Sequence, residues 1–113
     1  MKVKRIVANI AHARPEEAKA FYRDVPGMDV AMDFGWIITF ASAAAQVTVA
    51  SQGGSGTPAP DLSIEVDDLD EALDRVSKAG LPIEYGPASE PWGVRRFYVR
   101  DPFGRLLNIL AHA

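Results

Sequence analysis

Two parts of the sequence repeat the same order of predicted elements, and this repeat limits the possible folds more than any other feature. Residues 4–10 and residues 62–66 alternate apolar and polar side chains, which predicts a strand at the start of each part. An apolar stripe at helical spacing follows each strand. The stripes consist of Ala18, Phe21, Tyr22 and Val25 in the first part and of Leu69, Ala72, Leu73 and Val76 in the second. One offset of 54 residues superposes both the strands and the helices, as it places Ile10 on Ile64.

The remaining elements complete the same order in both parts. Strands are predicted over residues 36–40 and 46–50 in the first part and over residues 95–100 and 105–110 in the second, with short extended pieces near residues 28–32 and 82–85. Asp68 and Glu71 have the spacing of a helix capping box, and residues 101–104, Asp-Pro-Phe-Gly, form a turn motif. Each part therefore has the order strand–helix–strand–strand–strand, which predicts an α+β fold.

The length of 113 residues corresponds to one domain. A segment rich in Gly, Ser and Pro over residues 52–60 predicts an exposed connection between the two parts. It divides the domain into a first module over residues 1–51 and a second module over residues 61–113. Neither module alone is long enough to make a comfortable independent core, so we expect the two to form one domain.

The composition argues against several classes of protein. Cysteine is absent, so the chain has no disulfide scaffold, thiolate metal site or cysteine nucleophile. The net charge of −3 argues against a basic surface for nucleic acids. No apolar run approaches the roughly 20 residues of a membrane span, and the charged start over residues 1–5 leads directly into the first predicted strand. We therefore expect a cytoplasmic domain without nucleic-acid or membrane partners.

A single helix covers only one face of its sheet, so the opposite face of each module is free to line a cavity. Strand alternation assigns Val7, Asn9 and Ala11 to this helix-free face in the first module. In the second module it assigns eight further side chains to the helix-free face: Asp61, Ser63, Glu65, Arg96, Tyr98, Leu106, Asn108 and Leu110. This combination of polar, aromatic and aliphatic side chains is typical of a small-molecule site.

Three segments resemble motifs of the vicinal oxygen chelate superfamily, which contains glyoxalases, bleomycin-resistance proteins and extradiol dioxygenases. They are residues 18–24 (AKAFYRD), residues 62–72 (LSIEVDDLDEA) and residues 96–110 (RFYVRDPFGRLLNIL). The three segments occur in the family's order and spacing, and together with the repeat they cover nearly the whole chain. The resemblance implies two βαβββ modules that form a U-shaped mixed sheet around a cavity, commonly in a homodimer.

Enzymes of this superfamily hold a divalent metal ion with His, Gln or Glu side chains from fixed strand positions. The resemblance places these positions at Val7, Thr48, Asp61 and Asn108. Only the third of them is an ordinary anionic ligand, and one carboxylate does not suffice for a metal site. His12 and His112 lie outside the ligand positions. We therefore expect no metal ion, no other cofactor and no catalytic residue.

This loss of ligands resembles the antibiotic-resistance branch of the superfamily, which binds its drug without catalysis. Residues 90–93, Glu-Pro-Trp-Gly, followed by Arg95, resemble a loop that flanks the drug groove in bleomycin-resistance proteins. Trp92 in this loop either stacks on a planar ligand or covers its own loop or a dimer contact. For Trp36, a position in the core or in an interface competes with a ligand contact.

Several polar residues of the helix-free face have both a structural and a ligand-binding interpretation. Three short polar side chains either hydrogen-bond one another or contact a ligand, namely Asn9, Ser63 and Asn108. Tyr98 offers its hydroxyl to a ligand or to a structural hydrogen bond. Asp61 and Glu65 need a counter-charge if they are buried, and either Arg96 or a cationic ligand supplies it.

The sequence therefore predicts a metal-free protein that binds a small molecule and sequesters it, with an antibiotic as one candidate. The candidate ligand-binding residues are Asn9, Trp36, Asp61, Ser63, Glu65, Trp92, Arg96, Tyr98 and Asn108. Two alternatives remain. One is a lyase, isomerase or dioxygenase of the same superfamily with an atypical metal site, or with Glu65 or Asp61 as a general base. The other is a module whose sheet face only forms a dimer.

Overall fold

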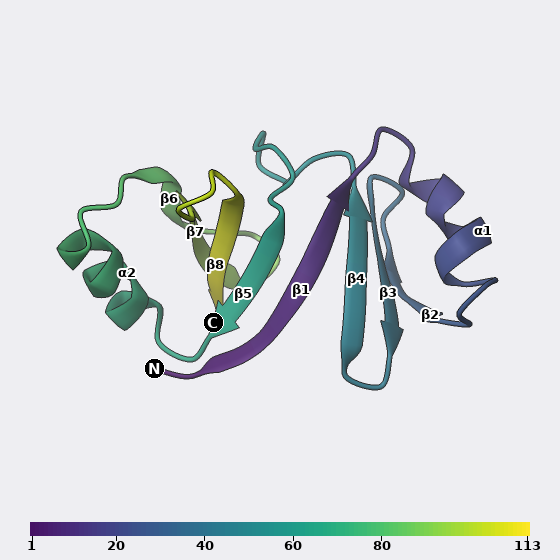
Figure 1. Ribbon diagram of the computed structural model, residues 1–113, viewed down its shortest axis with the longest axis horizontal. Coiled ribbons are helices and arrows are strands. Elements are labelled where there is room, and N and C mark those ends of the chain that lie inside the picture. The colour runs from purple at the N-terminus through teal and green to yellow at the C-terminus, as the bar shows by residue number, and fades with distance from the viewer. The chain divides into compact units, whose positions relative to one another are not determined.

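The two parts of the repeat fold as two units in the computed structural model, which describes residues 1–113 (Figure 1). The N-terminal unit consists of Val7–Ala59, and the C-terminal unit consists of Met1–Ile6 together with Pro60–Ala113. The first strand, β1 (Val3–Ala11), therefore contributes its beginning to the C-terminal unit and its end to the N-terminal unit.

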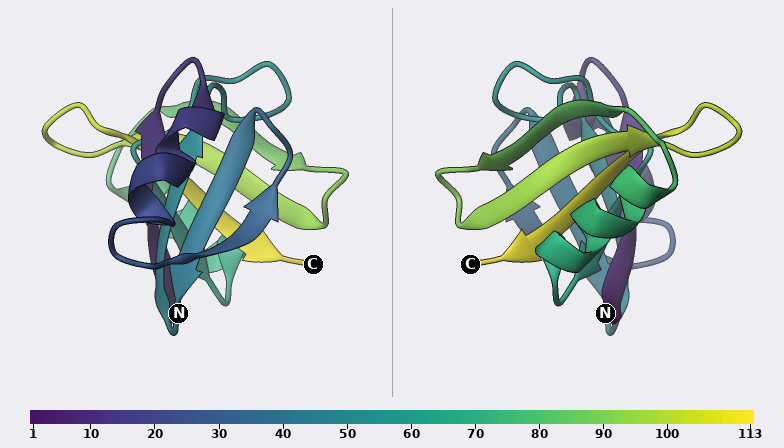
Figure 2. Two further views of the ribbon diagram at one scale, coloured as in Figure 1. Left: turned by 90° about the vertical axis from the view of Figure 1, so that its right-hand side faces the viewer. Right: turned by 90° about the vertical axis from the view of Figure 1, so that its left-hand side faces the viewer.

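The N-terminal unit has the order of elements that its sequence predicts. After β1 come the short helical segments η1 (Pro15–Ala18) and α1 (Lys19–Tyr22), and then β2 (Asp29–Asp33), β3 (Ile37–Ser42) and β4 (Ala45–Ala50). The strand order is β2-β3-β4-β1, in which β1 is parallel to β4 and the other neighbours are antiparallel. The helical segment lies across one face of this sheet (Figure 2, left).

The core of the N-terminal unit contains side chains of β3 and β4 that face the helical segment. Ile38, Phe40 and Val49 are buried there. Tyr22 packs on Phe40 with 5.4 Å between the ring centroids, and Ala18 lies against the same cluster. Two members of the predicted helical stripe therefore face the core as expected.

The other two members of that stripe do not face the core. Phe21 and Val25 are 56% and 68% exposed, and Val25 lies beyond the α-helix, which ends at Tyr22. Val25 precedes Pro26, and a residue before proline disfavours the α conformation. The chain therefore leaves the helix before the stripe is complete, and the prediction of a longer helix was wrong.

Burial along β1 also differs from the prediction. Alternation placed Ile6 against the helix and Val7 on the opposite side of the strand, yet Val7 is buried and Ile6 is exposed. The alternation itself is present, with the two side chains in different environments. Alternation determines which residues share a side of a strand, but it does not determine which side is covered.

The C-terminal unit repeats the same order with a longer helix. It contains β5 (Leu62–Val66), α2 (Leu69–Lys78), β6 (Ile83–Ser89), β7 (Val94–Arg100) and β8 (Leu106–His112). The strand order is β5-β8-β7-β6, in which β5 is parallel to β8 and the other neighbours are antiparallel, and the start of β1 lies beside β5.

The helix α2 begins at the predicted cap and packs across one face of its sheet (Figure 2, right). The side chain of Asp68 accepts a hydrogen bond of 3.0 Å from the backbone N–H of Glu71. Leu69 and Ala72 are buried against Phe97. The predicted apolar stripe of this helix is therefore confirmed.

The segment between the two parts is more structured than its composition predicts. Gly54 and Thr57 form a β-bridge, and the Thr57 hydroxyl donates a hydrogen bond of 2.7 Å to the Gly54 carbonyl. Thr57 and Pro60 are buried. The expectation of a wholly exposed connection was therefore wrong, because this turn satisfies its own polar groups and need not remain in water.

The turn between β7 and β8 forms as its motif predicts. The backbone N–H of Gly104 donates to the carbonyl of Asp101 over 3.1 Å. The Asp101 carboxylate also accepts hydrogen bonds of 2.9 Å from the backbone N–H groups of Phe103 and Arg105. These contacts fix the register of the last two strands, which carry much of the candidate site.

Neither helix is long and apolar enough to cross a membrane.

Candidate functional site

The candidate site is the face of the C-terminal sheet that α2 does not cover. Phe97, Val99 and Ile109 pack on the helix side, so their neighbours in β7 and β8 point to the opposite side. The register then forms two rows across the sheet, with Ser63 beside Asn108, Tyr98 and Tyr85, and with Glu65 beside Leu110 and Arg96. We call these seven residues the helix-free face.

A buried arginine occupies the middle of this face. The side chain of Arg96 lies among three aromatic rings and is only 3% exposed. Its Cζ atom is 5.0 Å from the centroid of Trp92, 5.1 Å from that of Tyr98 and 5.4 Å from that of Tyr85. Cations at such distances from aromatic rings are attracted to the π-electrons of the rings. The aromatic side chains therefore stabilise a charge that burial alone would make costly.

Glu90 supplies the counter-charge of Arg96. Its carboxylate is buried and lies 3.3 Å from Nη2 of the arginine. Its other oxygen accepts a hydrogen bond of 2.7 Å from the hydroxyl of Tyr85. Nη1 of Arg96 donates a bond of 3.0 Å to the Tyr98 hydroxyl. The arginine is therefore held by a carboxylate and a phenol as well as by the rings.

The sequence left open whether Arg96 or a cationic ligand balances Asp61 and Glu65. The structure places Leu110 of β8 between Glu65 and Arg96 in the row across the sheet, and Arg96 pairs with neither carboxylate. The partner is Glu90, which precedes the Pro-Trp-Gly segment and was not a candidate. The signal that could have identified it is the need of a buried guanidinium for a nearby carboxylate in the flanking loop.

The close approach of β6 to β7 depends on a glycine. Gly86 has a φ of +85°, and a Cβ atom at this position would lie 2.5 Å from the carbonyl oxygen of Arg96. The strand pairing shifts register between Tyr85 and Ala88, at the same place. Only glycine adopts this backbone conformation readily and leaves room for the neighbouring strand. The shift helps to place the Tyr85 ring over Arg96.

Trp92 is held over the arginine by a hydrogen-bonded turn. The backbone N–H of Glu90 donates to the carbonyl of Val94 over 2.7 Å, and the N–H of Gly93 donates to the carbonyl of Glu90 over 3.1 Å. The indole is 49% exposed although it lies against a buried cation. The sequence left open whether this side chain covers its own loop or stacks on a ligand. In the structure, one side of the Trp92 ring covers the guanidinium of Arg96, while about half of Trp92 remains exposed.

Asn108 brings a polar group into the buried part of the face. It is 7% exposed, and its Nδ2 atom donates a hydrogen bond of 3.1 Å to the hydroxyl of Ser63. Its Oδ1 atom is buried without a hydrogen-bond partner. A buried acceptor without a partner costs about 1–3 kcal/mol. The atom is enclosed by protein, so a ligand reaches Oδ1 only if the side chains around it move.

Glu65 forms a second charged cluster at the edge of the face. Its carboxylate is buried, and it lies 2.8 Å from Nε of Arg5 and 2.8 Å from Nδ1 of His112. Burial by itself would raise the pKa of Glu65, but the hydrogen bond from His112 and the charges of His112, Arg5 and Lys4 together lower this pKa below its usual value. The folded protein therefore favours the ionised form of this carboxylate.

The lowered pKa of Glu65 predicts a loss of stability in acid. A carboxyl group with a lower pKa in the folded state stabilises the protein above its unfolded pKa, which is 4.5 here, and this contribution disappears as the pH falls through the folded pKa. We expect Glu65→Gln to lower the free energy of unfolding at pH 7, and the difference from wild type to shrink by about pH 3. Urea denaturation at both pH values measures this difference.

A matched control for that experiment is Glu84→Gln. Glu84 is an exposed carboxylate that pairs with Arg100 over 2.6 Å. Exposed pairs contribute about 0–1 kcal/mol, so this variant should change little at either pH. An equal loss of stability for Glu65→Gln at both pH values would show that Glu65 is not a source of the acid sensitivity.

Three predicted site residues belong neither to the helix-free face nor to the turn that holds Trp92 over it. Asp61 is exposed, and its carboxylate accepts a bond of 3.0 Å from the backbone N–H of Leu106, so it anchors the start of β8. Asn9 belongs to the N-terminal unit, where it pairs in register with Thr48. Trp36 is half-buried just before β3 of the same unit.

The side chains at the superfamily's metal positions do not fit a metal ion. Val7 has no donor atom, and the hydroxyl of Thr48 hydrogen-bonds the hydroxyl of Thr39 over 3.0 Å. Asn108 offers one neutral amide oxygen, so Asp61 is the only carboxylate among the four. No group of three or more His, Asp or Glu side chains that could hold a metal ion occurs in the chain. Divalent metals in proteins require more anionic or imidazole ligands than this set provides.

The order of elements defines an α+β fold, with the strand order β2-β3-β4-β1 in the N-terminal unit and β5-β8-β7-β6 in the C-terminal unit. The model of the Glyoxalase/Bleomycin resistance protein/Dioxygenase superfamily matches residues 3–109. The chain therefore belongs to this superfamily, and the resemblance found in its sequence motifs is confirmed. No curated protein sequence matches the chain.

Solved structures show the same fold at low sequence identity. A chain described as NAD-dependent benzaldehyde dehydrogenase from Legionella pneumophila has a TM-score of 0.78 and 16% identity, covering 96% of this chain and 100% of that chain. A superfamily member from Vibrio splendidus 12B01 has a TM-score of 0.73 and 16% identity, with coverages of 96% and 98%. Methylmalonyl-CoA epimerase from Mycobacterium tuberculosis has a TM-score of 0.66 and 19% identity, with coverages of 98% and 87%. These likenesses establish the fold alone.

Proposed function

We propose that the chain binds a small planar molecule at the helix-free face of its C-terminal unit and sequesters it without catalysis. The observation that carries this proposal is Trp92, an indole held over the buried Arg96 while half of its surface remains exposed. A large aromatic surface fixed in this way is prepared to stack on a flat ligand at little cost in side-chain entropy. Superfamily membership supports an antibiotic as one candidate for the ligand.

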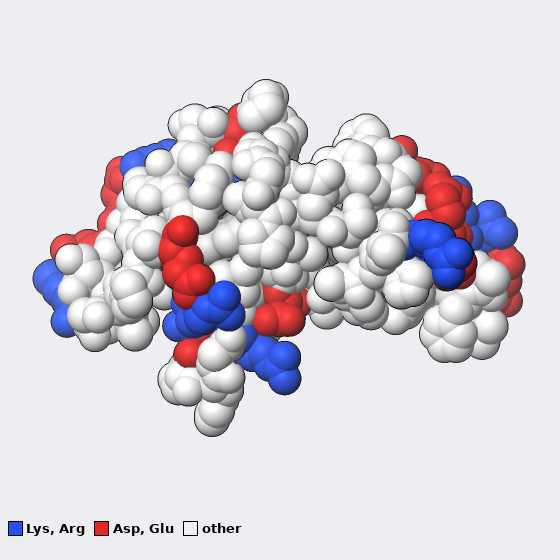
Figure 3. All heavy atoms as spheres, turned by 90° about the horizontal axis from the view of Figure 1, so that it is seen from above, with Lys and Arg blue, Asp and Glu red and all other residues white.

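The chemistry of the face indicates a ligand recognised by shape and hydrogen bonding more than by net charge. The charge of Arg96 is balanced by Glu90, and that of Glu65 is balanced by Arg5 and His112. On the surface, basic and acidic side chains lie next to one another on the face seen in Figure 3. The ligand is therefore recognised by stacking on the exposed part of the indole and not by a net charge of the site.

Removal of the indole should weaken binding of an aromatic antibiotic. We expect the wild-type protein to bind metal-free bleomycin in isothermal titration calorimetry, and we expect Trp92→Ala to bind it at least about tenfold more weakly. The reason is the loss of one stacking contact, which is worth about 0.5–1.5 kcal/mol beyond the apolar area that it buries, and about 1.4 kcal/mol in total corresponds to a factor of ten. The remaining tryptophan, Trp36, provides a fluorescence signal to verify that the variant is folded.

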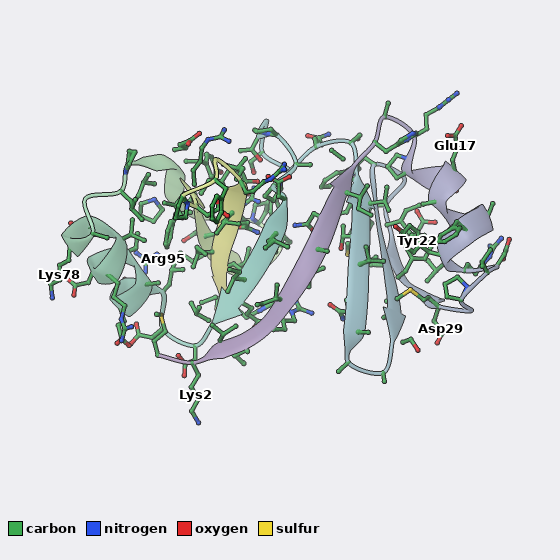
Figure 4. All side chains as sticks on the ribbon, viewed as in Figure 1. Lys2, Glu17, Tyr22, Asp29, Lys78 and Arg95 are labelled. Atoms are coloured by element: carbon green, nitrogen blue, oxygen red, sulfur yellow. The ribbon has the colours of Figure 1, made fainter.

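Arg95→Gln is the matched control for this measurement. Arg95, labelled in Figure 4, is on the helix side of β7 and pairs with Asp70 of α2 over 2.7 Å. Strand alternation therefore places it on the opposite face from its neighbour Arg96. This variant should bind bleomycin as tightly as the wild type does. Equal binding by Trp92→Ala and the wild type would place the ligand elsewhere.

The two alternative functions are separated by native mass spectrometry of protein purified from its own host. A retained organic molecule supports sequestration. A stoichiometric divalent metal ion, together with enzymatic activity when that metal is added, would instead support a lyase, isomerase or dioxygenase. A dimer that carries neither ligand nor metal would favour a module that only dimerises.

We also propose that the protein acts as a homodimer in the cytoplasm. The sequence motifs resemble a superfamily whose members commonly pair, and the absence of cysteine agrees with a reducing compartment. Light scattering coupled to size-exclusion chromatography measures the mass in solution. A mass of one chain at micromolar concentration would contradict the dimer.

A further inference from the structure

A shallow pocket of about 230 Å³ lies in the N-terminal unit, on the helix side of its sheet. Four apolar side chains line it, namely Ile10, Ala18, Tyr22 and Val49. Three exposed polar side chains complete the lining, namely His12, Arg14 and Glu17. Figure 4 shows Glu17 at the start of the helical segment and Tyr22 directed toward the sheet. The proposed ligand-binding face belongs to the other unit and to the helix-free side, so this pocket is a separate site.

The internal repeat shows what the corresponding place contains in the C-terminal unit. Ile10 pairs in parallel register with Val49 in the same way as Ile64 pairs with Ile109. The offset that places Ile10 on Ile64 also places Glu17 on Glu71. The same framework of two parallel strands and a helix start is therefore present in both units.

In the C-terminal unit, Met1 and Lys2 lie beside the start of α2, next to Asp67 and Glu71. The backbone N–H of Lys2 donates to the Asp67 carboxylate over 2.8 Å, and the N–H of Asp67 donates to the Lys2 carbonyl over 3.1 Å. The α-ammonium group of Met1 then lies 3.0 Å from Oε2 of Glu71. The other oxygen of Glu71 accepts a bond of 2.9 Å from Arg75. The ammonium group of Met1 thus pairs with one oxygen of Glu71, the residue that corresponds to Glu17 in the repeat.

The carboxylate of Glu17 also pairs with an arginine, although not with the corresponding one. Its Oε1 atom is 3.1 Å from Nε of Arg14, which precedes it by three residues, whereas Arg75 follows Glu71 by four. Its Oε2 atom has a longer contact of 4.0 Å with Nε2 of His12. The other ring nitrogen of His12 accepts a hydrogen bond of 3.0 Å from the backbone N–H of Arg14. Oε2 therefore has room for a closer partner, and the apolar side chains of the pocket lie beside it.

We propose that this pocket binds a small primary amine with an apolar group. The ammonium group pairs with Oε2 of Glu17, as the Met1 ammonium group pairs with Oε2 of Glu71, and the apolar group covers Ile10, Ala18 and Val49. The pocket is smaller than the roughly 300–1,000 Å³ of sites for drug-sized ligands, so the occupant is a short alkylamine or a compound of similar size. The charge of Arg14 is already balanced by Glu17, so a carboxylate ligand gains less than an amine.

Titration with n-butylamine, followed by two-dimensional ¹H–¹⁵N NMR of the full chain, tests this site. We expect saturable shifts at the amide signals of Ile10, His12 and Ala18, with a dissociation constant of about 1 mM for so small a ligand. Glu17→Gln should weaken binding by at least about fivefold, because the hydrogen bond to an ionised acceptor is lost. Ala18→Leu should weaken it as well, because the larger side chain fills the pocket.

Two kinds of control distinguish the proposed contact from general effects of charge. Glu16→Gln removes the neighbouring carboxylate, which pairs with Lys19 over 3.1 Å and does not line the pocket, so it should leave the affinity unchanged. The uncharged n-butanol should bind more weakly than the amine, and the anion butyrate should not produce saturable shifts. Equal binding of butyrate, or unchanged binding by Glu17→Gln, would overturn the proposal. The bleomycin titration concerns the other unit, so either result stands without the other.

Discussion

Replacement of Arg96 by methionine should lower the free energy of unfolding by about 3–5 kcal/mol, because it leaves the buried Glu90 carboxylate without its compensating cation. Methionine preserves much of the apolar stem of the arginine, so the packing among the three aromatic rings changes less than it would with alanine. Urea denaturation followed by circular dichroism measures the loss. The variant should also lose affinity for bleomycin, since Trp92 loses the guanidinium on which it rests.

The double variant Arg96→Met with Glu90→Gln identifies the cause of this loss. A neutral glutamine needs no counter-charge and still accepts a hydrogen bond from the Tyr85 hydroxyl, which is 2.7 Å from the carboxylate in the wild type. The double variant should therefore recover at least half of the stability that the single variant loses. If the two substitutions were additive instead, the instability would come from lost packing and not from an uncompensated charge.

Most of the fold could be predicted because the repeat contains two independent copies of the same information. The strand and helix patterns of the second part, with the cap at Asp68 and the stripe from Leu69 to Val76, correspond closely to α2. In the first part, the helix was predicted too long, since the apolar spacing of Phe21 and Val25 continues beyond the helix end at Tyr22. Periodicity alone cannot detect such an end, whereas the proline after Val25 could have indicated it.

The composition of the helix-free face could also be predicted, but the pairing of its charges could not. Alternation correctly placed Arg96 and Tyr98 opposite Phe97, because β7 is regular along its length. Alternation gives the side of the sheet and not the neighbouring strand, so it left open whether Arg96 or a cationic ligand balances Asp61 and Glu65, from which Arg96 is separated by β8. The actual partner, Glu90, comes from a loop whose position depends on the register shift at β6. Contacts of this kind depend on tertiary structure, and one sequence contains little information about them.

The pocket of the N-terminal unit was not predicted at all. Both copies of the repeat have an isoleucine and a glutamate in corresponding places, namely Ile10 with Glu17 and Ile64 with Glu71. The difference between them is that the start of the chain lies beside Glu71. A repeat therefore predicts the shared framework, while the differences between its copies arise from segments outside the repeated pattern.

Replacement of Phe97 by alanine should cause a comparable loss of stability through a different mechanism. Phe97 is fully buried between β7 and α2, where it contacts the cluster of Val66, Leu69 and Ala72. Removal of a buried phenyl group costs about 3–5 kcal/mol, because it loses apolar burial and leaves a cavity. Phe103→Ala is the matched control, since Phe103 is 87% exposed at the tip of the turn between β7 and β8. It should change the free energy of unfolding by less than about 0.5 kcal/mol.

The same variant tests whether the candidate site depends on the core beneath it. Phe97 stands between Arg96 and Tyr98 in one strand, so its contacts with α2 hold the backbone that places both of them on the opposite face. A domain with a total stability of about 5–15 kcal/mol remains mostly folded after this loss unless it begins near the lower end of that range. We therefore expect Phe97→Ala to bind bleomycin more weakly even at temperatures where circular dichroism shows a folded protein. Full affinity in the folded variant would mean that the turn carrying Trp92 forms the site without support from the core.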